Sequence, residues 1–288
     1  MITTVLTDTT SVSLVSDKKR FKPYSELTIA DDFMFGKLFQ DRACLNRLLE
    51  ILLHISPDES ITEITAQRDF RVAPDRKRII TDITARSPTA EYDLEMQQQV
   101  HSDLPRRARY YQSIMDINFL HTKQEYTQLK KNYVMFICLR DPFKKRLPVY
   151  TFRNLCEEKP SVQLGDGTTK IFYNVRNYAK MHDKEVRAFM EYVSTNKATT
   201  AYTETLEDMV EDIRANQLWR KEYMDEMQEN LLLQHEQERK ERAAREEGIA
   251  TGAQQARLDF AVKYKALGHS NEETADFFGL SLAEVERL

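Results

Sequence analysis

Apolar side chains recur at helical spacing near the start of the chain and alternate with polar ones soon afterwards. Between Leu27 and Ile55 the apolar positions follow a helical period that the polar residues QDRA interrupt, which predicts two short helices. Segments 61–72 and 78–86 alternate and are rich in β-branched residues, and segment 91–99 alternates as well. These three segments are predicted strands.

The middle of the chain continues with one helix, three strands and another helix. An apolar stripe predicts a helix over 104–121, and the continuous apolar run 133–139 predicts a strand buried on both faces. Segments 147–154 and 170–177 read as two further strands around the turn signal LGDGTT, and 184–194 as a closing helix. The order predicts an α/β domain with a mixed sheet flanked by helices.

The composition changes near residue 200. Residues 204–248 contain no proline and are dense in Glu, Lys and Arg, which predicts one long charged helix that packs on the domain or pairs with another chain. A solvated helix without a partner is the open alternative. We therefore expect a flexible tail over 1–20, a domain over 21–200, a long helical region over 201–250, and a small helical segment over 251–288 with two short helices around GLS.

Composition and charge narrow the class of protein. The net charge of −4 gives no overall attraction for nucleic acid, so any such attraction must come from a local patch. Cys44, Cys138 and Cys156 are widely spaced and form no C-x-x-C pair, which favours a reducing compartment. No segment approaches the roughly 18 apolar residues of a membrane span. We expect a cytoplasmic protein without a membrane partner.

Two acids face each other if the predicted strands 78–86 and 91–99 form a hairpin. Ser87 and Pro88 are typical turn residues, and a turn centred between Pro88 and Thr89 pairs Asp82 directly with Glu95. The same register pairs apolar residues with each other on one face and leaves four polar residues on the other: Asp82, Asp93, Glu95 and Gln97. Like charges that oppose each other directly destabilise a sheet, so something must offset the repulsion.

Two compensations remain open at this point. One carboxylate can hold a proton through a raised pKa, or a divalent cation can bind between Asp82 and Glu95. Mg²⁺ prefers oxygen ligands, and the adjacent backbone carbonyl of Met96 can serve as a third ligand. The segment contains no His or Cys, which disfavours zinc. The alternative is that the acids only decorate a solvated sheet face.

Several sequence blocks, taken together and in order, resemble a known family. They are DDFMFGKLFQD (31–41), YDLEMQ (92–97), LPRRARYYQSIMDIN (104–118), YVMFICLRDPF (133–143), LPVYTFRNLCEE (147–158) and DGTTKIFYN (166–174). The hairpin resembles the metal-binding hairpin of the PD-(D/E)XK nuclease superfamily. The chain resembles more closely the Rpn family of recombination-promoting nucleases, or PD-(D/E)XK family transposases, over roughly residues 22–247.

The resemblance implies roles for the hairpin residues. Asp82 fills the Asp position and Glu95 the (D/E) position, and both would bind Mg²⁺, or Mn²⁺ as the second candidate ion. Gln97 stands where the wider superfamily has Lys, and would orient the attacking water through neutral hydrogen bonds. Asp82 follows Thr81, whereas the strict pattern has proline before the acid.

A basic helix after the hairpin is a candidate DNA contact. Arg106, Arg109 and Tyr110 share one side of this helix, with Gln112 nearby, and arginine suits phosphate oxygens. A solvated basic face is the alternative.

A third acid is a candidate in the first helix, as the resemblance implies. Either Asp31 or Asp32 can supply it, and the alternative for both is a capping acid at the helix N-terminus.

The functional expectation is a Mg²⁺-dependent DNA endonuclease linked to recombination, mobile-element movement or defence. The alternative is a catalytically inactive nuclease fold that binds DNA or oligomerises. The charged helical region also predicts a homodimer formed through the C-terminal part of the chain.

Overall fold

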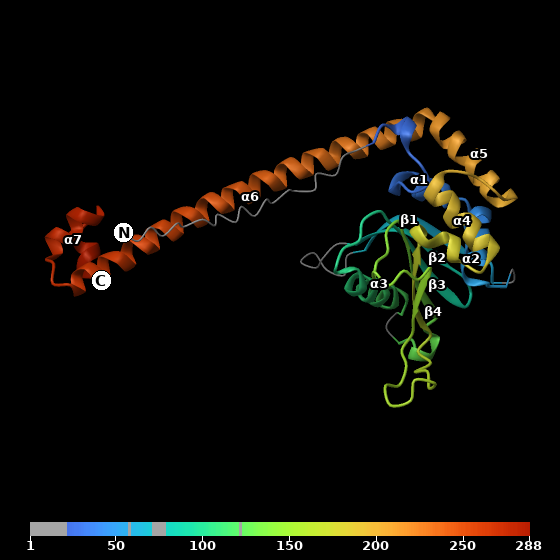
Figure 1. The fold of residues 1–288 in the computed structure, drawn as a ribbon, viewed down its shortest axis with the longest axis horizontal. Coiled ribbons are helices and arrows are strands. Elements are labelled where there is room, and N and C mark those ends of the chain that lie inside the picture. The colour runs from blue at the N-terminus through green and yellow to red at the C-terminus, as the bar shows by residue number, and fades with distance from the viewer. Residues whose placement is uncertain (1–21, 57–58, 71–78, 121–122) are drawn as a thin grey trace, which may run out of the picture. The chain divides into compact units, whose positions relative to one another are not determined.

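The computed structural model describes residues 22–56, 59–70, 79–120 and 123–288 of the chain (Figure 1). The expected tail over residues 1–20 therefore lies outside the described residues. The chain divides into two compact units, Met1–Tyr223 and Met224–Leu288. Among the helices of the described ranges, none combines the length and the apolar character that crossing a lipid bilayer requires.

The first unit is built on one mixed sheet of six strands in the order β1-β2-β3-β4-β6-β5. The strands are β1 (Glu63–Phe70), β2 (Ile79–Arg86), β3 (Ala90–Gln97), β4 (Lys131–Cys138), β5 (Val149–Phe152) and β6 (Thr168–Asn174). β3, β4 and β6 run parallel to one another, and the other neighbouring pairs are antiparallel. The predicted α/β class with a mixed sheet is confirmed.

Helices cover both faces of this sheet. One core joins the sheet to the helices α1 (Asp32–Leu38), α2 (Arg42–Leu53), α4 (Lys184–Thr195) and α5 (Ala201–Ala215). A separate core joins the opposite face to α3 (Leu104–Phe119) alone. Figure 1 shows α3 on one side of the strands and α1, α2 and α4 on the other. Short 3₁₀ helices complete the unit: η1 (Tyr24–Glu26), η3 (Tyr126–Gln128) and η4 (Val175–Lys180).

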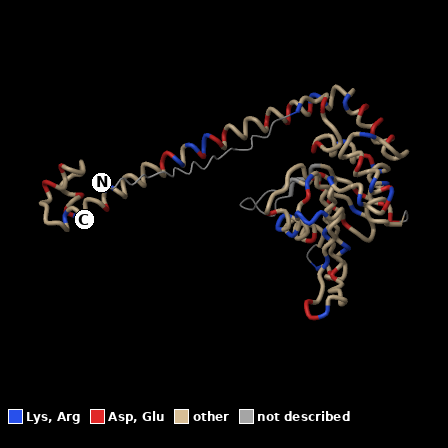
Figure 2. Tube along the Cα trace, in the orientation of Figure 1, with Lys and Arg blue, Asp and Glu red and all other residues tan. Residues whose placement is uncertain are grey.

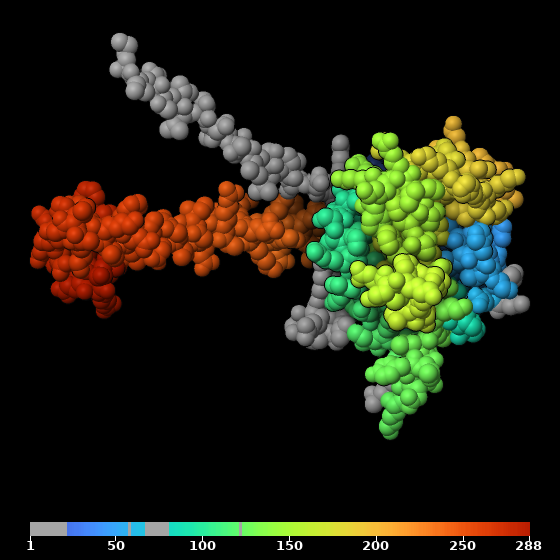
Figure 3. Space-filling view, turned by 60° about the horizontal axis from the view of Figure 1, so that its bottom comes forward, coloured from blue at the N-terminus to red at the C-terminus, as the bar shows by residue number. Residues whose placement is uncertain are grey.

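Local sequence signals set the limits of the packed helices. The Asp41 side chain accepts a hydrogen bond from the Cys44 amide at the start of α2, and Asp183 accepts two amides at the start of α4. These carboxylates satisfy amides that lack a partner within the helix. α2 and α4 lie side by side on the surface, where Figure 3 shows them in blue and yellow.

The end of α2 is tied to the sheet by one buried hydrogen bond. The Tyr173 hydroxyl donates to the carbonyl oxygen of Leu52 at 2.6 Å, and this carbonyl is one that the last turn of a helix leaves unpaired. We expect Tyr173→Phe to cost about 1 kcal/mol of unfolding free energy, because it leaves that carbonyl without its donor. The melting temperature should fall by about 2–4 °C, and scanning calorimetry would measure it. An unchanged melting temperature would contradict this assignment.

Two sequence predictions need correction. The long helix predicted over 204–248 is two helices, α5 and α6 (Gln217–Ala266), because Asn216 separates them. The Asn216 side chain accepts the amides of Leu218 and Trp219, so it caps a new helix instead of continuing the old one. The two strands predicted over 147–154 and 170–177 are present as β5 and β6, but β5 is shorter than predicted and β6 begins and ends earlier. The residues between them form a long connection with one isolated bridge, between Leu155 and Gln163.

The second unit contains the C-terminal part of α6, with α7 (Asn271–Phe278) and α8 (Leu282–Glu286). A small apolar cluster of Ala261, Ala275, Leu280 and Val285 holds these helices together. Ser270 and Ser281 cap the two short helices, which confirms the prediction of two helices around GLS. Figure 2 shows acidic and basic residues of both signs along α6.

Candidate active site

The two acids of the hairpin meet as the apolar pattern predicts. β2 and β3 pair Ile83 with Leu94 and Ala85 with Tyr92, and the Ser87 amide donates to the Ala90 carbonyl across the turn. The ladder ends at the pair of Ile83 with Leu94, one residue before Asp82 and Glu95. The predicted turn, and the predicted register as far as Ile83, are therefore confirmed.

Each carboxylate accepts a backbone amide from the other strand. The Asp82 amide donates to Glu95 Oε1 at 3.0 Å, and the Met96 amide donates to Asp82 Oδ2 at 2.7 Å. The two bonds run in opposite directions across the hairpin, so together they hold both side chains in place. The strands thus position the two acids before any ligand binds.

The polar face of the hairpin is buried, so the interpretation as a solvated sheet face is wrong. Asp93 is 0% exposed, Glu95 4% and Gln97 8%, whereas Asp82 is half-buried. α3 covers this face with its buried residues, which are Leu104, Ala108, Tyr111, Ile114 and Met115. The acids therefore lie where water is largely excluded, and their charges need compensation.

Arg107 of α3 supplies a positive charge at this site. Its Nη1 donates to Gln97 Oε1 at 2.9 Å, its Nη2 donates to the Tyr111 hydroxyl at 3.0 Å, and Nη2 lies 3.9 Å from Glu95 Oε2. The guanidinium also lies over the Tyr111 ring, 5.5 Å from its centroid. Sequence analysis missed Arg107. The available signal was its helical spacing, three residues after Leu104 and four before Tyr111, which puts it at the border of the buried stripe.

Burial makes the charged forms of two acids unfavourable. It raises the pKa of Glu95 well above its ordinary value, and the neighbouring Asp82 and Asp93 raise it further, while the Asp82 amide and Arg107 oppose the rise. Burial likewise raises the pKa of Asp93, with Asp82 the next contribution. For Glu95 and Asp93 these shifts have the direction of the first compensation considered from the sequence, a raised carboxylate pKa.

Asp93 has no hydrogen-bond donor on either carboxylate oxygen. Glu95 and Arg107 lie close enough to lower the Asp93 pKa in part, but the geometry gives neither oxygen a bonded partner. A buried carboxylate in this state needs a proton or a cation. It therefore marks this face as a place that attracts positive charge.

The groups on this face fit a hard divalent cation. Asp82 and Glu95 supply carboxylate oxygens, and Met96 directs its amide, and hence its carbonyl, toward the β2 side of β3. One or two carboxylates completed by water and phosphate are usual for Mg²⁺. Within the described ranges, no three His, Cys, Asp or Glu residues are arranged to hold a metal ion by themselves. Any metal bound here would keep positions open for water and substrate.

The Gln97 amide is held at both ends. Its oxygen accepts the bond from Arg107, and its Nε2 donates to the Gln99 carbonyl oxygen. Gln97 therefore fixes the orientation of Arg107 in the structure, and its predicted role in orienting water stays a prediction.

The two candidate third acids lie at the start of α1. Gln98 Nε2 donates to the Ala30 carbonyl at 3.1 Å and to Asp32 Oδ1 at 3.4 Å, which ties Asp32 to the end of β3. Asp31 occupies the N-cap position, but its side chain accepts no helix amide and binds Thr28 and Lys22 instead. Asp32 is the better placed of the two, and its role in metal binding stays a prediction.

The predicted DNA contacts on α3 differ in exposure. Arg106 and Arg109 are exposed and Tyr110 is half-buried, whereas Gln112 accepts a hydrogen bond from Lys170 Nζ of β6. The two arginines are therefore free to reach a ligand, and the Gln112 amide oxygen is already engaged.

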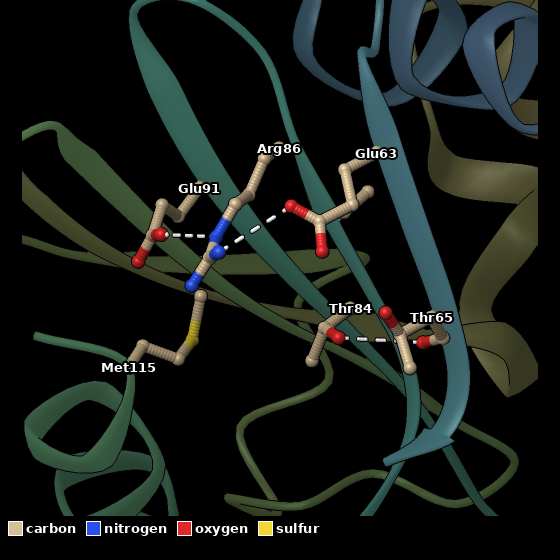
Figure 4. Close-up of a pocket in the computed structure, with 7 residues that line it drawn as sticks. Glu63, Thr65, Thr84, Arg86, Glu91 and Met115 are labelled. Atoms are coloured by element: carbon tan, nitrogen blue, oxygen red, sulfur yellow. Dashed lines mark hydrogen bonds and ion pairs between the residues drawn. The ribbon is translucent and has the colours of Figure 1, made fainter. Parts of the chain in front are cut away.

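At the other end of the same sheet face, a basic residue of the protein pairs with the acids. Figure 4 shows Arg86 between two acids: its Nε donates to Glu91 Oε1 at 2.7 Å, and its Nη1 lies 3.4 Å from Glu63 Oε2. Thr84 and Met115 line the same small hollow. The contrast with Asp93 is clear, because Glu91 has a direct cationic partner and Asp93 has no bonded one.

Comparison with known proteins gives one match. The family model described as PD-(D/E)XK nuclease family transposase matches residues 30–252. Neither the curated proteins nor the solved structures that were compared with the chain gave a match.

Proposed function

The chain belongs to the PD-(D/E)XK nuclease family transposases, and from this premise we propose that it is a Mg²⁺-dependent DNA endonuclease. The observation that carries the proposal is the reciprocal bonding of Asp82 and Glu95 across the hairpin, beside the unpaired buried carboxylate of Asp93. A link to recombination, mobile-element movement or defence is part of the same proposal.

The protein's own residues would divide the chemistry as follows. Asp82, Glu95 and the Met96 carbonyl would hold Mg²⁺, or Mn²⁺ in its place, and the bound ion would lower the pKa of a water and polarise the phosphate. Arg107, fixed by Gln97 and Tyr111, would stabilise negative charge that develops on the phosphate oxygens. α3 excludes water from the buried side of the site, which strengthens these electrostatic interactions.

Plasmid cleavage tests the proposal directly. Supercoiled plasmid should be nicked in Mg²⁺ or Mn²⁺ and should remain intact with a chelator. Asp82→Ala should lower the nicking rate by about 10² or more, because it removes one carboxylate of the metal site. Metal-dependent nicking that survives Asp82→Ala would refute the assignment of this residue.

One observation favours a second function. The Gln97 amide is engaged at both ends, and the position that is Lys in the wider superfamily provides no free cation. A catalytically inactive nuclease fold that binds DNA is the second candidate. Retention of DNA on the protein without cleavage, in both Mg²⁺ and Mn²⁺, would select it over the endonuclease.

We also propose that the protein forms a homodimer through α6 and the helices that follow. α6 carries exposed Leu231, Leu232 and Leu233 together with charges of both signs, and a second copy of the helix offers a complementary surface. Light scattering after size-exclusion chromatography should give twice the mass of one chain. A mass of one chain across the accessible concentrations would exclude the dimer.

A further inference from the structure

The connection between β4 and β5, residues 140–147, is built around one half-exposed carboxylate, that of Asp141. Asp141 accepts the amides of Phe143 at 3.1 Å, Lys144 at 2.9 Å and Arg146 at 2.6 Å. It also accepts the Tyr150 hydroxyl at 2.7 Å. Four donors on one carboxylate fix the path of this connection, here called the β4–β5 loop.

Two aromatic residues anchor the same loop to the sheet. The Tyr150 hydroxyl accepts the amides of Lys145 and Leu147, both at 3.2 Å. The Phe143 ring packs against Tyr150 at 4.9 Å and Phe172 at 5.0 Å between ring centroids. The loop is therefore pre-organised and does not depend on a ligand for its shape.

The loop places two long basic residues in a strained backbone conformation. Lys144 has a φ of 57° and Arg146 a φ of 58°, in the left-handed region that favours glycine. Glycine adopts this conformation without a steric cost, whereas Lys and Arg do not. Strain that the surrounding bonds maintain is typical of sites with a function.

The positive charges of the basic side chains in the loop are not balanced by nearby acids within the described residues. Arg140, Lys144, Lys145 and Arg146 are exposed, and none forms an ion pair with an acid in the described part of the chain. Asp141, the single acid of the loop, directs its oxygens to the loop's own donors. The loop therefore presents local positive charge on a protein whose net charge is −4.

Sheet topology brings this loop to the edge where the candidate active site lies. β3 and β4 are parallel and pair Gln97 with Cys138, and the Leu139 amide donates to the Gln97 carbonyl at 3.0 Å. The loop begins at the next residue, Arg140. The carboxyl end of β3, with Glu95 and Gln97, and the start of the loop are thus neighbours.

We propose that the β4–β5 loop is a binding site for the phosphate backbone of duplex DNA, next to the phosphodiester bond that the site at Asp82 and Glu95 would cleave. The proposal rests on the proposed function for its choice of ligand. Lys144, Lys145 and Arg146 contact phosphates and position the duplex, and they do not read its sequence. The acids of the hairpin repel phosphate, so a fixed basic neighbour offsets that repulsion.

The test measures binding of a short labelled duplex of mixed sequence in chelator, where cleavage cannot interfere. Replacing the three residues together (K144Q, K145Q and R146Q) should weaken binding at least about tenfold at moderate salt. The slope of log affinity against log salt concentration should fall by about 2.7, which is 0.9 for each lost phosphate contact. The matched control replaces exposed Lys131, Lys159 and Lys197, on other parts of the first unit, with glutamine and should leave affinity within about twofold of wild type.

A glycine variant separates binding from folding. Lys144→Gly with Arg146→Gly removes the charges and relieves the left-handed strain, so its melting temperature should equal or exceed that of wild type while its affinity falls. A lower melting temperature with unchanged affinity would overturn the proposal and assign the loop a structural role.

Three further outcomes are decisive. Equal weakening of duplex binding in the triple variant and its control would overturn the loop site. If the triple variant bound duplex DNA like wild type and lost affinity only for a single-stranded RNA probe, the loop site would also be overturned. Wild-type protein that binds duplex through the loop but never cuts it would refute the endonuclease and leave the loop site standing.

Discussion

Replacing Glu95 with glutamine is expected to abolish Mg²⁺-dependent cleavage and to stabilise the metal-free protein at the same time. The variant loses a metal-binding carboxylate, so nicking should fall by about 10² or more. It also removes a buried acid whose pKa burial raises, so the free energy of unfolding should rise by about 1 kcal/mol. Nicking rates and urea unfolding, both at neutral pH, measure the two effects.

Glu91 offers the matched control for Glu95. It lies on the same strand and the same buried face, but Arg86 pairs with it directly at 2.7 Å. Burial raises the pKa of Glu91 as well, but Arg86 opposes the rise through its charge and its hydrogen bond. Glu91→Gln should therefore leave cleavage near the wild-type rate and gain less stability than Glu95→Gln, because Arg86 loses a charged partner. If both variants kept their activity, Glu95 would not be a metal ligand. If both lost stability, the repulsion inferred at Glu95 would be wrong.

Asp93→Asn is expected to stabilise the metal-free protein in a pH-dependent way. A carboxyl whose pKa is raised on folding binds more protons in the folded state, so the contribution of Asp93 to stability falls as pH rises above about 4, the ordinary carboxyl value. Asparagine does not titrate. The two proteins should therefore have similar stability near pH 4 and should diverge as pH increases, with a difference of about 1–3 kcal/mol once Asp93 would be charged.

Unfolding curves collected across this pH range test the Asp93 prediction. The stability of the wild type relative to the variant should fall as pH rises. Parallel curves would show that Asp93 has the same pKa in both states, and a less stable variant would show that the carboxylate has a partner in solution.

The local geometry of the site was predictable, but its surroundings were not. Alternation in residues 78–99 fixed the strand register, because a slip of one residue would have moved Leu94 to the face that carries the acids and placed a polar residue in the apolar core. Periodicity also predicted α3 as a helix. It could not show that α3 covers the acids, since alternation distinguishes two faces of a strand without identifying what packs on either. Arg107 was missed for that reason.

The helix break at Asn216 illustrates a different limit. Residues on both sides of Asn216 have good helical propensity, and the apolar spacing continues across it. The Asn216 side chain competes for two amides and begins a new helix, which composition over a long window does not reveal.

The exposure of α6 determines how the protein responds to heat. From Arg239 to Gly252 every side chain is exposed, and Gly248 and Gly252 have no neighbouring atoms within 4 Å of an added Cβ. Such a stretch, if unpaired, melts gradually by helix–coil transition, whereas the packed first unit unfolds cooperatively. Circular dichroism of a monomer should therefore lose helical signal before the calorimetric peak, and pairing with a second copy would make that early loss depend on protein concentration.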